Sequence, residues 1–101
     1  MLHMVVNTHS AESCAFRNDE NKEKLTGGFN AMAEAASANG ASLKEAWANM
    51  ASHTIFALFE APDAHVMDAV LRDAGVVGYT QSRVFAVNTM QTALDAVAAT
   101  E

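Results

Sequence analysis

The sequence predicts an α+β domain in which two helices cover a four-stranded antiparallel sheet, with a third helix following the last strand. Extended segments with alternating or continuous apolar residues indicate strands, and segments with apolar residues three and four apart indicate helices. The 101 residues are 50% hydrophobic and 18% charged, which is enough apolar material for one core. We therefore expect residues 1–101 to form a single domain.

Residues 2–9 show the period-two pattern of a β-strand. One side of this strand carries Leu2, Met4 and Val6, and the other carries His3, Val5, Asn7 and His9. We expect helices to cover the first side and to leave the second side open. Residues 10–18 lack helical spacing and are predicted to form a loop.

The first helix is predicted to begin near Asp19, a residue type that suits the N-cap position. Its apolar residues recur at spacings of three and four, at Leu25, Phe29, Met32, Ala33 and Ala36. The pair Asn39-Gly40 is typical of a helix end. The pattern therefore predicts a helix of about twenty residues packed on the sheet.

Two further strands are expected at residues 42–50 and 53–60. The first contains Leu43, Trp47 and Met50 among polar groups, and its Ala and Glu residues would also suit a helix. The second is apolar on both sides through its six central positions, as in an internal strand.

The last third of the chain predicts a helix, a strand and a closing helix. Pro62 suits the first position of a helix that ends at Gly75, and Tyr79–Val87 is predicted to be the fourth strand. Asn88 and Gln91 resemble a capping box. The closing helix has its apolar residues at Met90, Ala93, Leu94 and Val97.

The order βαββαβ is the split βαβ, or ferredoxin-like, arrangement. Right-handed crossovers place the first and third strands in the centre and both helices on one face. The third and fourth strands run antiparallel to the first, so they begin beside its end. We therefore expect His53 and Tyr79 to approach His9, with Cys14 nearby on the loop that follows the first strand.

The end of the third strand, Phe59-Glu60-Ala61-Pro62-Asp63, together with the element order, resembles the small GYD-domain proteins and, more widely, the dimeric α+β barrel superfamily. Where the GYD family has a Tyr-Asp pair before the third strand, this chain has His53 and Thr54. The resemblance implies a homodimer in which two sheets pair, open face to open face, around a small-molecule cavity. The superfamily includes cofactor-independent isomerases and monooxygenases, haem-handling proteins and sensors, so the fold alone selects no function.

The charge balance argues against a nucleic-acid partner, because six Lys and Arg against twelve Asp and Glu give a net charge of -6. No apolar stretch approaches the roughly 20 residues that span a bilayer, so we expect no membrane partner. The single cysteine excludes an intramolecular disulfide, and residues 1–7 lack the basic start and long apolar run of a secretory signal. We therefore expect a cytoplasmic protein.

The clearest chemical constellation is His9, Cys14 and His53, two imidazoles and a thiol. These ligand types suit zinc, copper or nickel, and Glu12 could add a fourth ligand from the same loop. In the structural alternative, the imidazoles donate hydrogen bonds to loop carbonyls and Cys14 is a small buried apolar group.

Proton transfer is a second hypothesis, with His9, His53 and Tyr79 as the catalytic set, because imidazole titrates near neutrality. Asn7, Arg83 and Trp47 are the predicted ligand-binding residues: Arg83 would bind an anion, and Trp47 would stack on a ring. Arg83 could instead pair with a carboxylate across a dimer interface.

Together these observations predict a homodimer or higher homo-oligomer that binds a small molecule, with a His/Cys site at the end of the open sheet face. The first alternative is a cofactor-independent isomerase or monooxygenase with a histidine general acid/base. The second is a transition-metal-binding or structural assembly protein.

Overall fold

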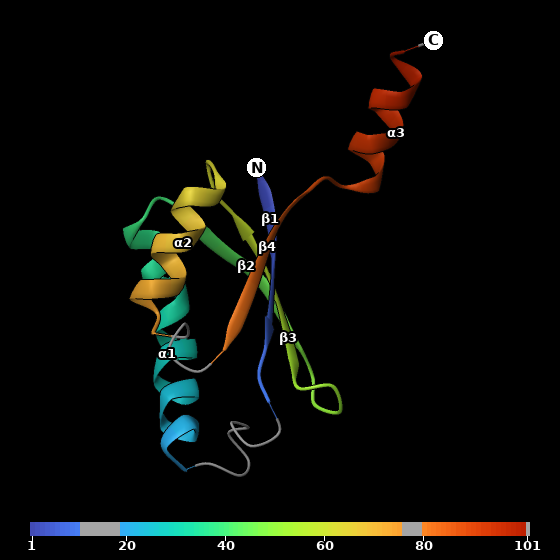
Figure 1. Cartoon of the computed structure of the whole chain (residues 1–101). Coiled ribbons are helices and arrows are strands. Elements are labelled where there is room, and N and C mark those ends of the chain that lie inside the picture. Colours follow the sequence, from blue (N-terminus) through green and yellow to red (C-terminus); the bar gives the residue numbers. More distant parts are fainter. Residues whose placement is uncertain (11–18, 76–79, 101) are drawn as a thin grey trace.

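The structure, a computed structural model, describes residues 1–10, 19–75 and 80–100. The elements follow the predicted βαββαβ order with a further helix (Figure 1). They are β1 (Leu2–Thr8), α1 (Asp19–Ala38), β2 (Ser42–Asn49), β3 (Thr54–Glu60), α2 (Ala64–Asp73), β4 (Gln81–Val87) and α3 (Met90–Ala98). The ferredoxin-like α+β fold predicted from the sequence is therefore confirmed.

The four strands form one sheet in the order β2-β3-β1-β4, with antiparallel pairing between all neighbours. The central positions of β1 and β3 agree with the prediction. Figure 1 shows α1 and α2 together on one side of this sheet. Among the described residues, no helix is both long and apolar enough to cross a membrane.

The ends of α1 and α2 are tied together by one side chain. The amide nitrogen of Asn39 donates to the Ala35 carbonyl at 2.8 Å and to a carboxylate oxygen of Asp73, at the end of α2, at 2.9 Å. Gly40 follows with φ 74, a left-handed conformation that glycine adopts without a Cβ penalty. The predicted Asn39-Gly40 stop is therefore correct.

Two helix starts differ from the prediction. Pro62 lies before α2, because Asp63 is the N-cap and its carboxylate accepts the Val66 N–H at 2.9 Å. The capping box expected from Asn88 and Gln91 does not form. The N-cap of α3 is Thr89, whose hydroxyl accepts the Thr92 N–H, while the Gln91 amide donates to Asp95.

The core lies between the sheet and the helices α1 and α2. Val5, Ala57 and Phe59 of the sheet and Met32, Met67 and Val70 of the helices are each fully buried. His3 and Asn7 lie on the same side of β1 as Val5 and are 1% and 2% exposed.

The expectation that the His3, Val5 and Asn7 side of the first strand is the open side is therefore wrong. The register explains the difference: His3 pairs with Phe59 and Val5 pairs with Ala57, so these four side chains share one face. That face receives the small residues Ala35 and Ala36 of α1, which allow a helix to approach the sheet closely.

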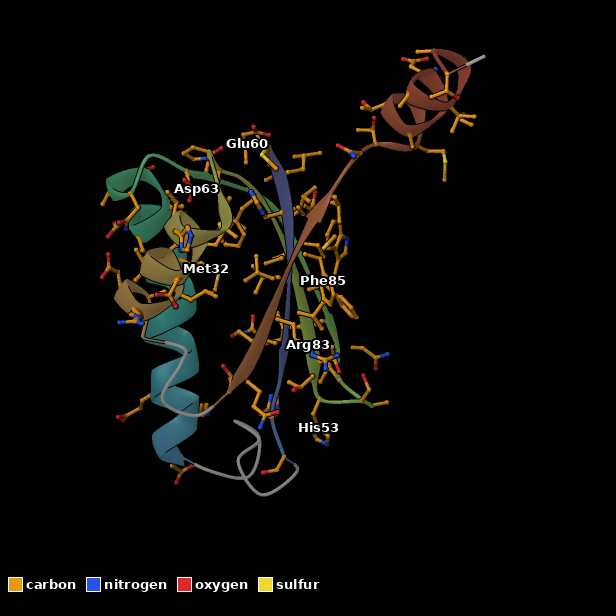
Figure 2. All side chains as sticks on the ribbon, turned by 45° about the horizontal axis from the view of Figure 1, so that its top comes forward. Met32, His53, Glu60, Asp63, Arg83 and Phe85 are labelled. Atoms are coloured by element: carbon orange, nitrogen blue, oxygen red, sulfur yellow. The ribbon has the colours of Figure 1, made fainter. Side chains whose placement is uncertain are left out.

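The opposite face of the sheet carries no helix (Figure 1). We call it the open face, and the strand registers arrange its residues in transverse rows, each written from β2 to β4. The rows are Asn49–Thr54–Thr8–Gln81, Trp47–Phe56–Val6–Arg83, Glu45–Leu58–Met4–Phe85 and Ser42–Glu60–Leu2–Val87. Figure 2 shows Arg83 and Phe85 on this side of the sheet and Met32 on the helix side.

Helix α3 stands apart from the rest of the fold (Figure 1). Every residue from Asn88 to Thr100 is exposed. The radius of gyration is 15.1 Å, whereas a compact chain of this length has a value of about 13 Å. The projecting helix accounts for this elongation.

Candidate functional site

Two histidines meet at the end of the sheet where β1 stops and β3 begins. The ring centroids of His9 and His53 are 5.2 Å apart, and the ring planes are 69° from parallel. His9 directly follows β1, and His53 is the last residue of the turn before β3. Figure 2 shows His53 at this end of the sheet.

Antiparallel pairing brings these two positions together. The pairs Asn7–Ile55 and Thr8–Thr54 close the ladder, and the next step places His9 opposite His53. The backbone N–H of His9 donates to the His53 carbonyl at 3.3 Å, which extends the ladder by one bond. The approach of His53 to His9 that strand order predicts is therefore present.

The backbone of His53 is unusual, with φ 53 in the left-handed region. Only a small fraction of residues other than glycine adopt this conformation, although histidine does so more often than most. The turn of residues 50–53 therefore holds an imidazole at a position where glycine would be less strained.

His9 is desolvated although the residue as a whole is partly exposed. Both of its ring nitrogens are buried and have no hydrogen-bond partner among the described residues. Burial lowers the pKa of His9 from its usual 6.5, and the charge of the neighbouring His53 lowers it further. His9 is therefore neutral at physiological pH. In a neutral imidazole one ring nitrogen carries no proton, and the lone pair of that nitrogen can bind a ligand.

Asn7, near the His9–His53 pair, forms a polar cluster with Ser82 and Thr80 on the helix-covered face. Its amide nitrogen donates to the hydroxyls of Ser82 and Thr80 on the chain leading into and along β4. Its amide oxygen is buried without a partner in the described part of the chain. Neither Ser82 nor Thr80 was predicted from the sequence, although the position of Ser82 opposite Asn7 follows from the β1–β4 register.

The predicted ligand-binding residues divide between the two faces. Arg83 and Trp47 lie on the open face, whereas Asn7 is buried under the helices, so the expected trio does not form one site. The expectation that His9 and Asn7 belong to the open face fails for the same reason. Trp47 is 48% exposed and lies in one row with Phe56, Val6 and Arg83.

Cys14, Tyr79 and Glu12 lie outside the described residues, so their roles stay predictions from the sequence. Within residues 1–10, 19–75 and 80–100, no three His, Cys, Asp or Glu side chains are grouped closely enough to hold a metal. The described part of the candidate site is therefore the His9–His53 pair with Asn7 beside it.

The family model that matches this chain spans residues 1–101 and is described as a domain of unknown function, DUF3303. No curated protein is similar enough in sequence to count as a relative. Among solved structures, the chain resembles SCO4226 from Streptomyces coelicolor A3(2), with 20% sequence identity and a TM-score of 0.55. That similarity covers 86% of this chain and 96% of SCO4226, and at this identity it supports the fold alone.

Proposed function

This chain belongs to the DUF3303 family, whose function is unknown. From its own residues, we propose that it binds a transition metal ion through His9 and His53. Zinc, nickel and copper are the ions that paired imidazoles favour. The observation that carries the proposal is the contact between these two rings, in which both nitrogens of His9 are buried without a partner among the described residues.

The spacing of the rings supports chelation of one ion. Two imidazoles that bind a tetrahedral ion through metal–nitrogen bonds of about 2.0–2.1 Å have ring centres roughly 5 Å apart. The centroids of His9 and His53 are 5.2 Å apart. The separation of the two rings therefore matches the spacing that coordination of one ion by one nitrogen of each ring requires.

The protonation state also supports a metal. An imidazole must be neutral to coordinate an ion, and the lowered pKa of His9 keeps it neutral near pH 7. Cys14 and Glu12, predicted from the sequence as further ligands, would complete the coordination.

Calorimetric titration of tag-free protein with Zn²⁺ and Ni²⁺ near neutral pH tests this proposal. We expect one ion per chain. Replacing His9 or His53 by Ala should weaken metal binding at least about 100-fold. Loss of a residue that only supports a ligand weakens binding by up to about 100-fold, and loss of the ligand itself should cost at least as much. His65→Ala, on the exposed start of α2, is the matched control and should bind as the parent does. Equal affinity in all three variants would exclude the proposed site.

Proton transfer to a small organic substrate is the second candidate, favoured by the unpartnered amide oxygen of Asn7 near His9. Such a cofactor-independent isomerase or monooxygenase would need no metal. It would bind substrate analogues after removal of metal with a chelator, and His9→Ala would abolish turnover but leave the affinity for Zn²⁺ unchanged.

We propose as well that the open face pairs with the open face of a second copy. Its two middle rows carry Phe56, Val6, Leu58 and Met4 at their centres, on a face that no helix covers. These four side chains are half-buried and lie between Trp47 and Phe85, which are 48% and 47% exposed. An apolar surface of this kind marks an interaction site.

The edges of the open face favour a second copy over another partner. Edge strand β2 contributes Glu45 and Trp47, and the opposite edge strand β4 contributes Arg83 and Phe85. A two-fold axis parallel to the strands would place the β2 edge of each copy over the β4 edge of the other. Arg83 would then meet a carboxylate and an indole ring, both favourable partners of a guanidinium group.

Sedimentation equilibrium of Val6→Asp tests the pairing. A carboxylate at the centre of the face should dissociate the dimer and leave a folded monomer, because Val6 lies outside the core. Gln81→Asp, at the polar end of the same face, is the control and should remain dimeric. A parent protein that is monomeric at every concentration would exclude this interface.

A further inference from the structure

Helix α3 is capped at both ends but buries none of its residues against the described part of the chain. Thr89 caps its start, and Asp95 and Val97 accept the closing backbone bonds at its end. Its apolar side chains Met90, Leu94 and Val97 are 73%, 54% and 65% exposed. Their spacing of four and three residues places them in a single stripe.

A helix of this length needs a partner. It has nine residues, and isolated helices shorter than about 12–15 residues are marginal in water. Helix α2, with ten residues, meets this need by burying Met67, Val70 and Leu71 against the core. None of the residues of α3 is buried, so α3 gains no comparable stabilisation from packing against the described part of its own chain.

The position of α3 identifies the side on which that partner sits. Figures 1 and 2 show α3 beyond the end of the sheet, on the side away from α1 and α2. This is the side toward which the open face points. Val87 is the last open-face residue of β4, and only Asn88 and Thr89 separate it from the helix. Helix α3 therefore follows the open-face strand β4 directly and lies past the boundary of its own sheet.

We propose that α3 is an exchanged arm: each copy packs its Met90–Leu94–Val97 stripe against the second copy seated on its open face. This inference rests on the proposed pairing of open faces and adds the element that secures it. In the described part of the chain, the α3 stripe is exposed and no helix covers the open face, so a two-fold pair would cover both on both copies. With the axis given above, the element of the second copy nearest to α3 is β2.

Hydrogen exchange measured at two protein concentrations tests the exchange directly. Amides of residues 90–98 should be protected when the protein is dimeric and lose that protection on dilution to monomer. An arm folded back onto its own chain would stay protected at every dilution, and this would overturn the proposal.

Two charge substitutions sharpen the test. Leu94→Lys places a charge in the stripe and should weaken dimerisation about tenfold or more. Ala96→Lys places the same charge on the other side of α3 and should leave the dimer unchanged. Equal dimer stability in both variants, or a stable dimer with unprotected 90–98 amides, would overturn the exchanged arm but leave the pairing of sheets intact. A monomer at all concentrations would contradict the sheet pairing itself.

Discussion

The two sides of β1 differ in polarity, and the difference is the reverse of that in an ordinary half-exposed strand. The side covered by helices carries His3 and Asn7 with Val5 between them, all nearly fully buried. The side without helices carries Leu2, Met4 and Val6. Polar groups thus lie inside and apolar groups outside, whereas antiparallel strands usually show the reverse.

This inversion is the observation on which both proposals depend. Buried polar atoms such as the Asn7 amide oxygen and the His9 nitrogens lower stability unless a ligand or water satisfies them. Exposed apolar rows lower solubility unless another surface covers them. The proposed metal site would engage His9 at the end of the first side, and the proposed dimer with its exchanged α3 would cover the second side.

The largest contrast between the sides should appear in two phenylalanines of β3. Phe59→Ala removes a fully buried ring from the helix-covered side and should lower the free energy of unfolding by about 3–5 kcal/mol at any protein concentration. Phe56→Ala, on the open face, should lower it in a concentration-dependent way, because that ring acts through the dimer. Urea denaturation at several concentrations measures both, and a concentration-independent loss for Phe56→Ala would contradict the contrast.

A smaller effect is expected for the buried amide. Asn7→Ala leaves the hydroxyls of Ser82 and Thr80 without one bond each and should lower the free energy of unfolding by about 1–3 kcal/mol. Thr8→Ala, the next residue on the exposed side, is the control and should change stability little. Similar losses in both variants would show that the polar cluster contributes nothing specific.

The strained turn should show an effect of opposite sign. His53→Gly relieves a left-handed backbone at φ 53 and should raise the free energy of unfolding by about 1 kcal/mol. The same variant should lose metal binding. Thermal denaturation and calorimetry measure the two outcomes, and a variant that still binds Zn²⁺ as tightly as the parent would remove His53 from the site.

The smallest expected effect is on the pH dependence of stability. The folded pKa of His9 lies below its usual 6.5, so the unfolded chain binds this proton first as the pH falls. The contribution of neutral His9 to stability is therefore complete above about pH 6.5 and is lost as the pH falls through the lowered folded pKa. His9→Gln should flatten thermal stability between about pH 7.5 and pH 5, and His65→Gln should not. Parallel pH profiles for the parent and His9→Gln would contradict this assignment.

Much of this architecture was predictable from short patterns. The apolar run within residues 53–60 identified a central strand, and Asn39-Gly40 identified a helix end. The meeting of His9 and His53 followed from strand order, because antiparallel neighbours bring a chain end beside a chain start.

The side of β1 that helices cover was not predictable in the same way. Alternation shows that residues fall on two sides, but Met4 and Val6 are as apolar as any core pair. Which side receives the helices depends on the register with Ala57 and Phe59, a long-range property. The assignment of Asn7 with Arg83 and Trp47 to one site failed for this reason.

Imidazole NMR of the intact protein during titration with Zn²⁺ tests the metal site most directly, because the four histidines report separately. The account predicts that the ring resonances of His9 and His53 move together and stop at one ion per chain, while those of His65 stay in place. Movement of only one of the pair, or of His65 alone, would contradict a site shared by the two rings at the end of β1.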